Sequence, residues 1–245
     1  MTTGQDLSKR VALVTGASRG IGAAVARVLA AACAAVAVNY RERADDAETI
    51  VANIKSGGGR AIAVAADVSQ AAAVAKMVEQ VASALGPIDI LVNNAGVAIV
   101  RGVDELTEDD FDRTIAVNLK SAFLCTQAVL PAMRARKWGR IVNISSGAAR
   151  GAGAIGLHYN ASKAGMEGLT RGYAARLVKE GITVNAVAPS LIATDMMDGR
   201  TDLARNIPLG RMGQAEEVAQ AVAMVLGNDY MTGQTIMLNG GMAFI

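Results

Sequence analysis

A tyrosine and a lysine spaced four residues apart are the pair in this chain most suited to acid–base chemistry. They are Tyr159 and Lys163 in the stretch YNASK, and the whole sequence has one histidine. On a helix this spacing places both side chains on one face, about one turn apart. A phenol titrates near about pH 10 and a neighbouring ammonium favours its ionised form, so the two groups could replace histidine as a proton carrier. The alternative without chemistry is a half-buried tyrosine beside a lysine whose ammonium reaches solvent.

A glycine-rich stretch, VTGASRGIG, follows the first apolar run and has glycines at Gly16, Gly20 and Gly22. Glycine lets the backbone adopt positive φ and approach a ligand closely. A helix that begins near Gly20 would direct unpaired N–H groups and the positive end of its dipole toward a pyrophosphate. An ordinary tight turn is the alternative, but the position between the first strand and the first helix favours a dinucleotide site.

The stretch VNYRER, at the end of the second expected strand, bears on which dinucleotide binds. NAD sites of this type have an acidic residue there, whereas this chain has Asn39, followed by Arg41. Arg19 adds a guanidinium from the glycine-rich stretch. Because arginine can bind a phosphate through two hydrogen bonds, the pattern favours NADP(H). Glu42 weakens this interpretation, and the alternative is that Arg41 and Arg43 are solvated charges at a helix entry.

Seven apolar runs of strand length would position these residues. They lack the alternation of half-exposed strands, so they indicate strands that are covered on both faces. Stretches with helical spacing lie between them, as at 21–32, 44–55 and 71–85. Thr107, followed three residues later by Asp110, indicates a helix start. The expected strands begin at Val11, Ala35, Ala61, Ile88, Arg140, Ile182 and Gln234.

This alternation predicts an α/β fold, a Rossmann fold whose doubly wound parallel sheet of about seven strands has helices on both faces. The composition agrees, because 52% of the residues are hydrophobic but only 3% are aromatic. A core of alanine and aliphatic side chains suits helices and buried strands better than a β-sandwich. A single domain over 1–245 is expected, because no linker-like or low-complexity segment interrupts the pattern.

Charge and cysteine content exclude several classes of function. The formal net charge is +2 and the basic residues are spread along the chain, which gives no case for nucleic acid or a membrane surface. No apolar stretch approaches the roughly 20 residues that span a bilayer. Cys33 and Cys125 lie in apolar stretches, which indicates buried thiols in a reducing, cytoplasmic compartment. His158 has no Asp, Cys or second His near it in the sequence, so no metal site is expected.

Five stretches resemble, in the same order, the motifs of the short-chain dehydrogenase/reductase family. They are TGASRGIG, NNAG at 93–96, VNL around Asn118, NISS ending at Ser146, and YNASK. The resemblance covers essentially the whole chain, from about Val11 to Gly241. It implies an oxidoreductase with a nicotinamide cofactor, which supplies the hydride while the protein supplies orientation and a proton.

The resemblance implies four catalytic residues. Tyr159 would protonate the forming alkoxide, and Lys163 would lower the pKa of the phenol and hold the nicotinamide ribose. Ser146, thirteen residues before Tyr159, would donate a hydrogen bond to the substrate oxygen. Asn118 would hold a water that links the lysine to solvent, although an asparagine that only caps or kinks its helix is the alternative.

The resemblance also implies contacts with NADP(H). Asp67 and Val68 would meet the adenine ring, Ile192 the nicotinamide carboxamide through its backbone, and Thr194 the phosphates. Together with Tyr159 and Lys163, the expected cofactor-binding residues are Gly16, Ser18, Arg19, Gly20, Ile21, Gly22, Arg41, Asp67, Val68, Asn94, Ala95, Gly96, Pro189, Ile192 and Thr194.

Within the family, GRIVNISS, the PLGRMG turn and the ending NGGM are most similar to motifs of bacterial 3-oxoacyl-[acyl-carrier-protein] reductases. This resemblance implies NADPH-dependent reduction of a 3-oxoacyl thioester, with an acidic acyl carrier protein docking near Arg101 or Arg150. A stand-alone alcohol or sugar dehydrogenase and a non-catalytic NADP(H)-binding subunit are the alternatives. The family also implies a homotetramer built through the helices that contain Asn118 and Tyr159 and through the C-terminal strand.

Three features depart from the family pattern. Ser190 stands where most relatives have glycine, and a serine held at positive φ would cost energy. Cys33 stands where the first helix usually ends in glycine. The substrate lid expected near 193–210 is shorter than usual, which argues against a large rigid substrate such as a steroid.

Overall fold

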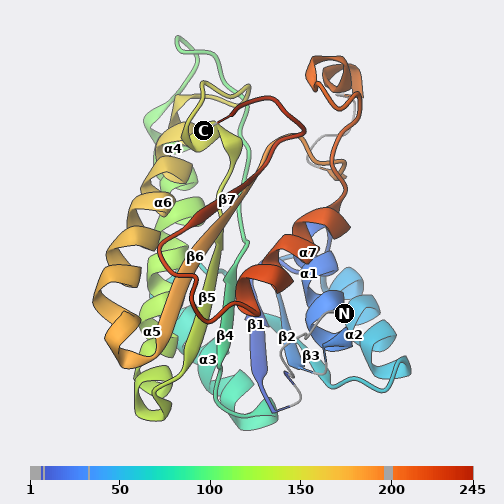
Figure 1. Ribbon diagram of the computed structural model, residues 1–245, viewed down its shortest axis with the longest axis vertical. Coiled ribbons are helices and arrows are strands. Elements are labelled where there is room, and N and C mark those ends of the chain that lie inside the picture. Colours follow the sequence, from blue (N-terminus) through green and yellow to red (C-terminus); the bar gives the residue numbers. More distant parts are fainter. Residues whose placement is uncertain (1–6, 8, 33, 196–200, 245) are drawn as a thin grey trace.

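The computed structural model describes residues 7, 9–32, 34–195 and 201–244, and its centre is a seven-stranded parallel sheet (Figure 1). The strands lie in the order β3-β2-β1-β4-β5-β6-β7, and every neighbouring pair is parallel. Their bounds are β1 Val11–Val14, β2 Ala35–Tyr40, β3 Ala61–Ala65, β4 Ile90–Asn93, β5 Gly139–Ile144, β6 Ile182–Pro189 and β7 Thr235–Leu238. The seven strands expected from the apolar runs are therefore confirmed.

Helices cover both faces of the sheet, as the alternating pattern predicts. One face carries α1 Gly20–Ala31, α2 Ala44–Ser56 and α7 Ala215–Leu226. The other carries α3 Ala71–Leu85, α5 Ser121–Arg136 and α6 Leu157–Leu177. A further helix, α4 Glu108–Ile115, begins after Thr107, whose hydroxyl accepts a hydrogen bond from the Asp110 amide at 3.1 Å. Short 3-10 helices span Gly147–Ala149, Val178–Glu180 and Thr201–Asn206, and a π-helical segment spans Ala116–Lys120.

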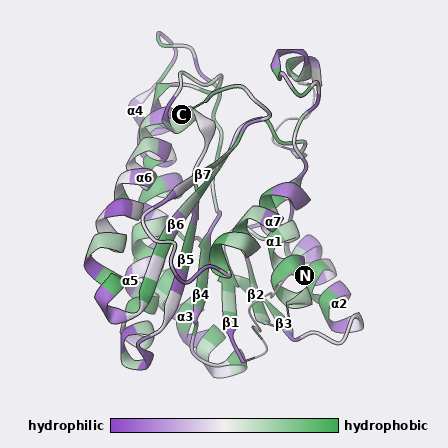
Figure 2. Ribbon diagram, in the orientation of Figure 1, coloured by the Kyte–Doolittle hydropathy of each residue, from purple (hydrophilic) through white to green (hydrophobic). Residues whose placement is uncertain are grey.

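The sheet separates two apolar cores, and neighbouring residues of one strand point into different ones. In β1, Ala12 and Val14 face the core under α1, α2 and α7, whereas Val11 and Leu13 face the core under α3, α5 and α6. The four residues are at most 5% exposed. Figure 2 shows hydrophobic residues along the strands and hydrophilic residues on the outer sides of the helices. Burial on both faces explains the continuous apolar runs in the sequence.

The strand order reverses between β1 and β4. After β1 the chain continues outward through β2 and β3, and then returns to pair β4 with the other edge of β1. In open α/β sheets this reversal leaves a crevice at the carboxyl ends of the strands, where ligands bind. The fold therefore places the glycine-rich stretch after β1 and the NNAG stretch after β4 on the two sides of one crevice.

The helical run 108–136, which joins α4 to α5, contains an 18-residue window apolar enough by length and composition to cross a membrane. The sequence reading overlooked this window. The run packs within the fold, where Cys125, Val129 and Met133 of α5 belong to the core shared with α3 and α6. Part of the apolar surface of the run is therefore core surface, and 39% of the window is buried.

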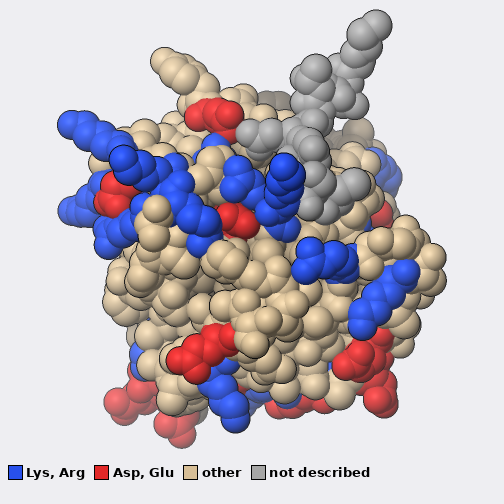
Figure 3. Space-filling view, turned by 90° about the horizontal axis from the view of Figure 1, so that it is seen from below, with Lys and Arg blue, Asp and Glu red and all other residues tan. Residues whose placement is uncertain are grey.

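Charges of both signs lie near one another on the surface. On the face seen in Figure 3, basic and acidic side chains occur together. Ion pairs formed by Arg134 with Glu180 and by Arg10 and Arg136 with Asp89 show the same mixing. This arrangement agrees with the small net charge of +2.

We expect Gly181→Ala to destabilise the protein by more than about 2 kcal/mol, because a Cβ at this position adds a steric clash to left-handed strain. Gly181, just before β6, has φ +78°, and its Cβ would lie 2.1 Å from the Lys137 carbonyl oxygen. Gly58→Ala is the matched control, because Gly58 has φ +82° and nothing within 4 Å of the added Cβ. Denaturant unfolding of the two variants measures the difference, and equal losses of stability would contradict this explanation.

Candidate active site

A cleft of about 400 Å³ opens at the carboxyl ends of the strands and is lined by the loops that follow β1 to β6. Of the residues expected to bind the cofactor or act in catalysis, only Gly22 and Asn118 do not line it. Those that line it are Gly16, Ser18, Arg19, Gly20, Ile21, Arg41, Asp67, Val68, Asn94, Ala95, Gly96, Ser146, Tyr159, Lys163, Pro189, Ile192 and Thr194. The crevice that the strand order predicts therefore brings residues from six separate loops together.

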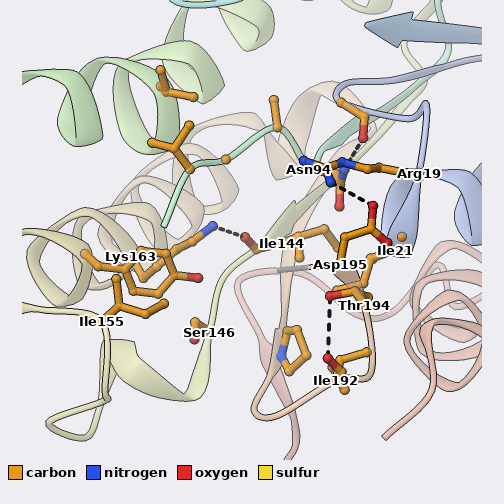
Figure 4. Close-up of a pocket in the computed structure, with 18 of the residues that line it drawn as sticks. Arg19, Ile21, Asn94, Ile144, Ser146, Ile155, Lys163, Ile192, Thr194 and Asp195 are labelled. Carbon is orange, nitrogen blue, oxygen red and sulfur yellow. Dashed lines mark hydrogen bonds and ion pairs between the residues drawn. The ribbon is translucent and has the colours of Figure 1, made fainter. Parts of the chain in front are cut away.

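Tyr159 and Lys163 lie one turn apart on α6, and Ser146, two residues after β5, is hydrogen bonded to the phenol. Figure 4 shows the lysine side chain reaching toward Ile144. Tyr159 is 8% exposed and Lys163 is 4% exposed. The lysine Nζ donates a 2.8 Å hydrogen bond to the carbonyl oxygen of Ile144, the last residue of β5, and lies 5.8 Å from the centre of the tyrosine ring. The end of β5 thus positions both the serine and the ammonium beside the phenol.

In the structure the pKa of Tyr159 is raised, and a lowering of this pKa by the charge of Lys163 stays a prediction. Burial raises the pKa of Tyr159, and a hydrogen bond with Ser146 lowers it by less. Burial also lowers the pKa of Lys163 to about 8. The physical reason is that both groups are shielded from water while the ammonium hydrogen bonds to Ile144. A phenol with a raised pKa stays protonated at neutral pH, and a protonated phenol can donate a proton.

Asn118 is fully buried and acts as a clamp on the loop after β4. Its Oδ1 accepts from the Val97 N–H at 2.8 Å, and its Nδ2 donates to the Val97 carbonyl at 3.0 Å. Nδ2 also lies 3.2 Å from Ser162 Oγ, and that hydroxyl donates to the Tyr159 carbonyl at 2.7 Å. Asn118 therefore joins the loop after β4 to the first turns of α6. Ser162 was not singled out from the sequence, although it lies inside YNASK.

Thr15 and Asn94 fix the two sides of the crevice to each other. The Thr15 hydroxyl accepts hydrogen bonds from the backbone N–H groups of Asn94 and Ala95, both at 3.0 Å. The Asn94 Nδ2 donates to the carbonyls of Thr15 and Gly16, both at 2.9 Å. The sequence reading missed Thr15, whose only signal was its position between β1 and the first glycine.

Gly22 has a packing role instead of lining the cleft. A Cβ at Gly22 would lie 2.5 Å from both the Gly16 carbonyl oxygen and the Asn94 Nδ2. The third glycine therefore lets α1 pack closely against the loops after β1 and β4. The expectation that Gly22 itself meets the cofactor has no support in this geometry.

Asn39 sits at the position where an acidic residue is typical of NAD sites, and it serves as a structural amide. It is 2% exposed, and its Oδ1 accepts from the Gly16 N–H at 3.1 Å. Its Nδ2 donates to the carbonyls of Val64 and Ala66, both at 3.2 Å. Asn39 thus ties the glycine-rich loop to β2 and β3.

The dinucleotide half of the cleft has the donors that phosphates require. The amino end of α1 has no side-chain cap and faces the cleft through Gly20 and Ile21, which leaves backbone N–H groups for an anion. Arg19, Arg41 and Arg43 line the same half. These groups fit a phosphorylated dinucleotide.

Asp67 also lines the cleft, so it is accessible to an adenine ring bound there. Its Oδ1 accepts hydrogen bonds from the Ser69 N–H at 2.9 Å and the Ser69 hydroxyl at 2.7 Å. Partial burial acts to raise the pKa of Asp67, but the bonds from Ser69 and the charge of Arg41 outweigh it, so the pKa is lowered. The carboxylate is therefore ionised at neutral pH.

The departures from the family pattern have simple outcomes. Ser190 lines the cleft without backbone strain, because among the described residues other than glycine only Lys137 has positive φ. Cys33 lies outside the described residues, and so do residues 196–200 of the expected lid. His158 is fully buried, and its Nε2 lies 2.9 Å from the Ile99 carbonyl oxygen, which is a packing role.

A family model described as short chain dehydrogenase matches residues 10–203. The chain belongs to the short-chain dehydrogenase family. The dehydrogenase is 43% identical over 241 residues to the 3-oxoacyl-[acyl-carrier-protein] reductase of Synechocystis, which covers 96% of this chain and 98% of the relative. It is also 43% identical to the corresponding reductase of Staphylococcus aureus, over 94% of this chain and 97% of the relative. The crystal structure of a blue fluorescent protein from a metagenomic library in complex with NADPH is 40% identical with a TM-score of 0.91, over 98% of this chain and 100% of that one.

We expect Asn39→Asp to destabilise the dehydrogenase by at least about 2 kcal/mol at neutral pH, because a buried carboxylate would face two carbonyl oxygens in place of an amide donor. Asn228→Asp is the control, because Asn228 is exposed and its Oδ1 only accepts, from the Tyr230 N–H. Urea unfolding measures both variants. A fully stable Asn39→Asp protein would show that the amide donors are dispensable.

We expect kcat/KM of the dehydrogenase for carbonyl reduction to fall as the pH rises above about 8. Lys163 loses its charge there, because burial lowers its pKa to about 8, whereas the raised pKa of Tyr159 keeps the phenol protonated. A profile of kcat/KM from about pH 6 to about pH 10 reports the groups of the free enzyme. In the Lys163→Arg variant the side chain keeps its charge over this range. The remaining kcat/KM of this variant should therefore not fall above about pH 8. A decline of the same size in that variant would assign it to another group.

Proposed function

We propose that the protein is an NADP(H)-dependent reductase that converts a 3-oxoacyl thioester to the 3-hydroxyacyl thioester, with Tyr159 as proton donor. The observation that carries the proposal is the different chemistry of the two ends of one cleft. One end presents arginines and an uncapped helix terminus, and the other presents a buried phenol, an ammonium and a serine. A relative 40% identical to this chain has been crystallised with NADPH, which supports this cofactor.

The cofactor would lie along the cleft and supply the hydride at its nicotinamide end. The amino end of α1, with Ser18, Gly20 and Ile21, would hold the pyrophosphate, and Arg19 and Arg41 the 2′-phosphate. Lys163 would hold the ribose next to the nicotinamide, and the loop containing Ile192 and Thr194 would close the opposite wall. Each of these roles is assigned to a residue that lines the cleft.

Proton transfer follows from the positions of the side chains. The Ser146 hydroxyl donates a hydrogen bond to the substrate oxygen and holds it beside the phenol. Tyr159 gives its proton to the oxygen as negative charge develops there. The Lys163 ammonium then stabilises the phenolate, which would otherwise be costly in a buried site. Asn118 supports this arrangement by holding the loop after β4 against α6, and we propose that it also holds the water through which the proton is replaced.

The lining of the catalytic end supports an acyl substrate over a sugar. Small or aliphatic side chains line part of the cleft. Ala148, Ala154 and Ile155 come from the segment between β5 and α6 that leads to Tyr159, and Val97 and Leu203 come from the segments after β4 and β6. Charged residues that line the described cleft, apart from Lys163, come from the loops after β1, β2, β3 and β6. A sugar would need several polar partners for its hydroxyl groups, whereas an acyl chain gains from apolar contact.

The rim near the catalytic end carries Arg101 and Arg150, which we propose as contacts for an acidic acyl carrier protein. The Arg101 N–H donates to the Ile155 carbonyl at 3.1 Å, so its loop adjoins the substrate loop. Both side chains are paired, Arg101 with Asp110 at 2.9 Å and Arg150 with Glu167 at 3.0 Å. Their free charge is therefore partly neutralised, which favours a weak and transient contact.

We also propose a homotetramer located in the cytoplasm. Phe111 of α4 and Phe123 of α5 are 38% and 43% exposed, and Phe244 near the C-terminus is 92% exposed. Apolar side chains on these elements suit subunit contacts. The Cys125 thiol is free and buried, which agrees with a reducing compartment.

We expect the purified protein to oxidise NADPH with a 3-oxoacyl thioester faster than with cyclic or sugar ketones, and Tyr159→Phe to lower this kcat by about 10²–10⁴-fold. NADPH binding should survive in the variant, because the phenol hydroxyl is not among the phosphate donors. Tyr173→Phe is the matched control and should keep its activity. Tyr173 lies further along α6, and its hydroxyl accepts a hydrogen bond from Gln127 of α5. Faster turnover of a sugar ketone would favour a sugar dehydrogenase, and an undiminished Tyr159→Phe variant would remove tyrosine as proton donor.

A further inference from the structure

Asp195 forms ion pairs with two arginines at the dinucleotide end of the cleft. Its Oδ2 lies 2.7 Å from Arg19 Nη1 and 3.7 Å from Arg43 Nη1. Figure 4 shows the first of these contacts reaching from the loop after β6 to the loop after β1. The three side chains are 49–51% exposed, so they lie in the cleft mouth and remain accessible to a ligand.

The position of these arginines matches that of an adenosine 2′-phosphate. In sheets of this topology the adenosine ribose lies near the end of β2. Arg43 lies three residues after β2 and Arg19 belongs to the loop after β1, and both line the cleft. A phosphate monoester carries up to two negative charges and requires arginine N–H donors, which are the groups that Asp195 engages.

Asp195 and a 2′-phosphate would repel each other if both bound these arginine donors, because both are negatively charged. A hydrogen bond from Arg19, followed by the nearby positive charges, lowers the pKa of Asp195, so the carboxylate is ionised at neutral pH. A carboxylate within a few ångströms of a phosphate is repelled by roughly 1 kcal/mol per charge pair even at the dielectric of water. Any 2′-phosphate that reaches Arg19 and Arg43 must therefore displace Asp195 or bear this repulsion.

We propose that Asp195 is a specificity-determining residue that competes with the adenosine 2′-phosphate for Arg19 and Arg43 and so weakens NADP(H) binding relative to NAD(H). This inference rests on the proposed binding of NADP(H). The opposite role is that Asp195 orders the two arginines for the phosphate, in which case its loss would weaken binding. Competition predicts that replacing Asp195 lowers the Kd for NADPH, whereas ordering of the arginines predicts that it raises this Kd.

The test is Asp195→Asn, with Kd measured by calorimetry for NADPH, NADH, adenosine 2′,5′-bisphosphate and adenosine 5′-monophosphate at one ionic strength. We expect Kd for the two 2′-phosphorylated ligands to fall by about five- to thirtyfold, from the loss of one or two like-charge contacts. Kd for NADH and the monophosphate should change by less than about twofold. In an Arg19→Ala background the gain should shrink, because one of the two contested donors is absent.

Glu180→Gln is the matched control for the removal of one exposed negative charge. Glu180 pairs with Arg134 at 2.7 Å and precedes β6, so it lies at the amino ends of the strands, opposite the cleft. This variant should leave the ratio of the NADPH and NADH affinities unchanged.

Weaker or unchanged NADPH binding in Asp195→Asn, with the wild type still preferring the 2′-phosphorylated ligands, would overturn the competition and leave the proposed cofactor standing. A wild type that binds the bisphosphate no better than the monophosphate would overturn both the competition by Asp195 and the proposed binding of NADP(H). Calorimetry of binding alone separates these outcomes from any failure of the proposed substrate.

Discussion

The active site depends on an ammonium group that is held away from water. Lys163 is 4% exposed and its Nζ donates to the Ile144 carbonyl. Because burial lowers its pKa to about 8, the charged form costs stability below about pH 8, and this cost fades as the pH rises toward the usual value of 10.5. The packing of α6 against the sheet must offset that cost at neutral pH. In return, the protein keeps a positive charge beside a phenol that it also buries.

Amide side chains hold the loops around this charge. Asn39 and Asn118 are buried and both donate and accept hydrogen bonds with the backbone, and the Asn94 side chain donates to the carbonyls of Thr15 and Gly16. An amide suits this task because it has both donors and acceptors and carries no charge to desolvate. The cleft is therefore a set of separate loops connected by neutral polar contacts. Its charged residues, with the exception of Lys163, lie toward solvent at the dinucleotide end.

Much of the fold could be predicted because the strands are covered on both faces and produce continuous apolar runs. The seven strands, their parallel pairing and the residues at their carboxyl ends followed from that pattern. The sequence could not show that Asn39 and Gly22 serve packing, because this depends on contacts with β3 and with the loop after β4. Nor could it show that the pKa of Tyr159 is raised, since this shift comes from the burial of the phenol, which depends on how α6 packs in the fold. Asp195 was missed because its arginine partners lie more than 150 residues away in the sequence.

The π-helical segment between α4 and α5 decides which faces of this long helix meet the rest of the protein. The Ser121 N–H bonds to the Ala116 carbonyl, five residues back, so this turn holds one residue more than an α-helical turn. Each residue of an α-helix advances the side-chain direction by about 100°. The extra residue therefore rotates the side-chain directions of α5 relative to those of α4 by about 100°. The same continuous element contacts α6 through Asn118 and the apolar core through Cys125.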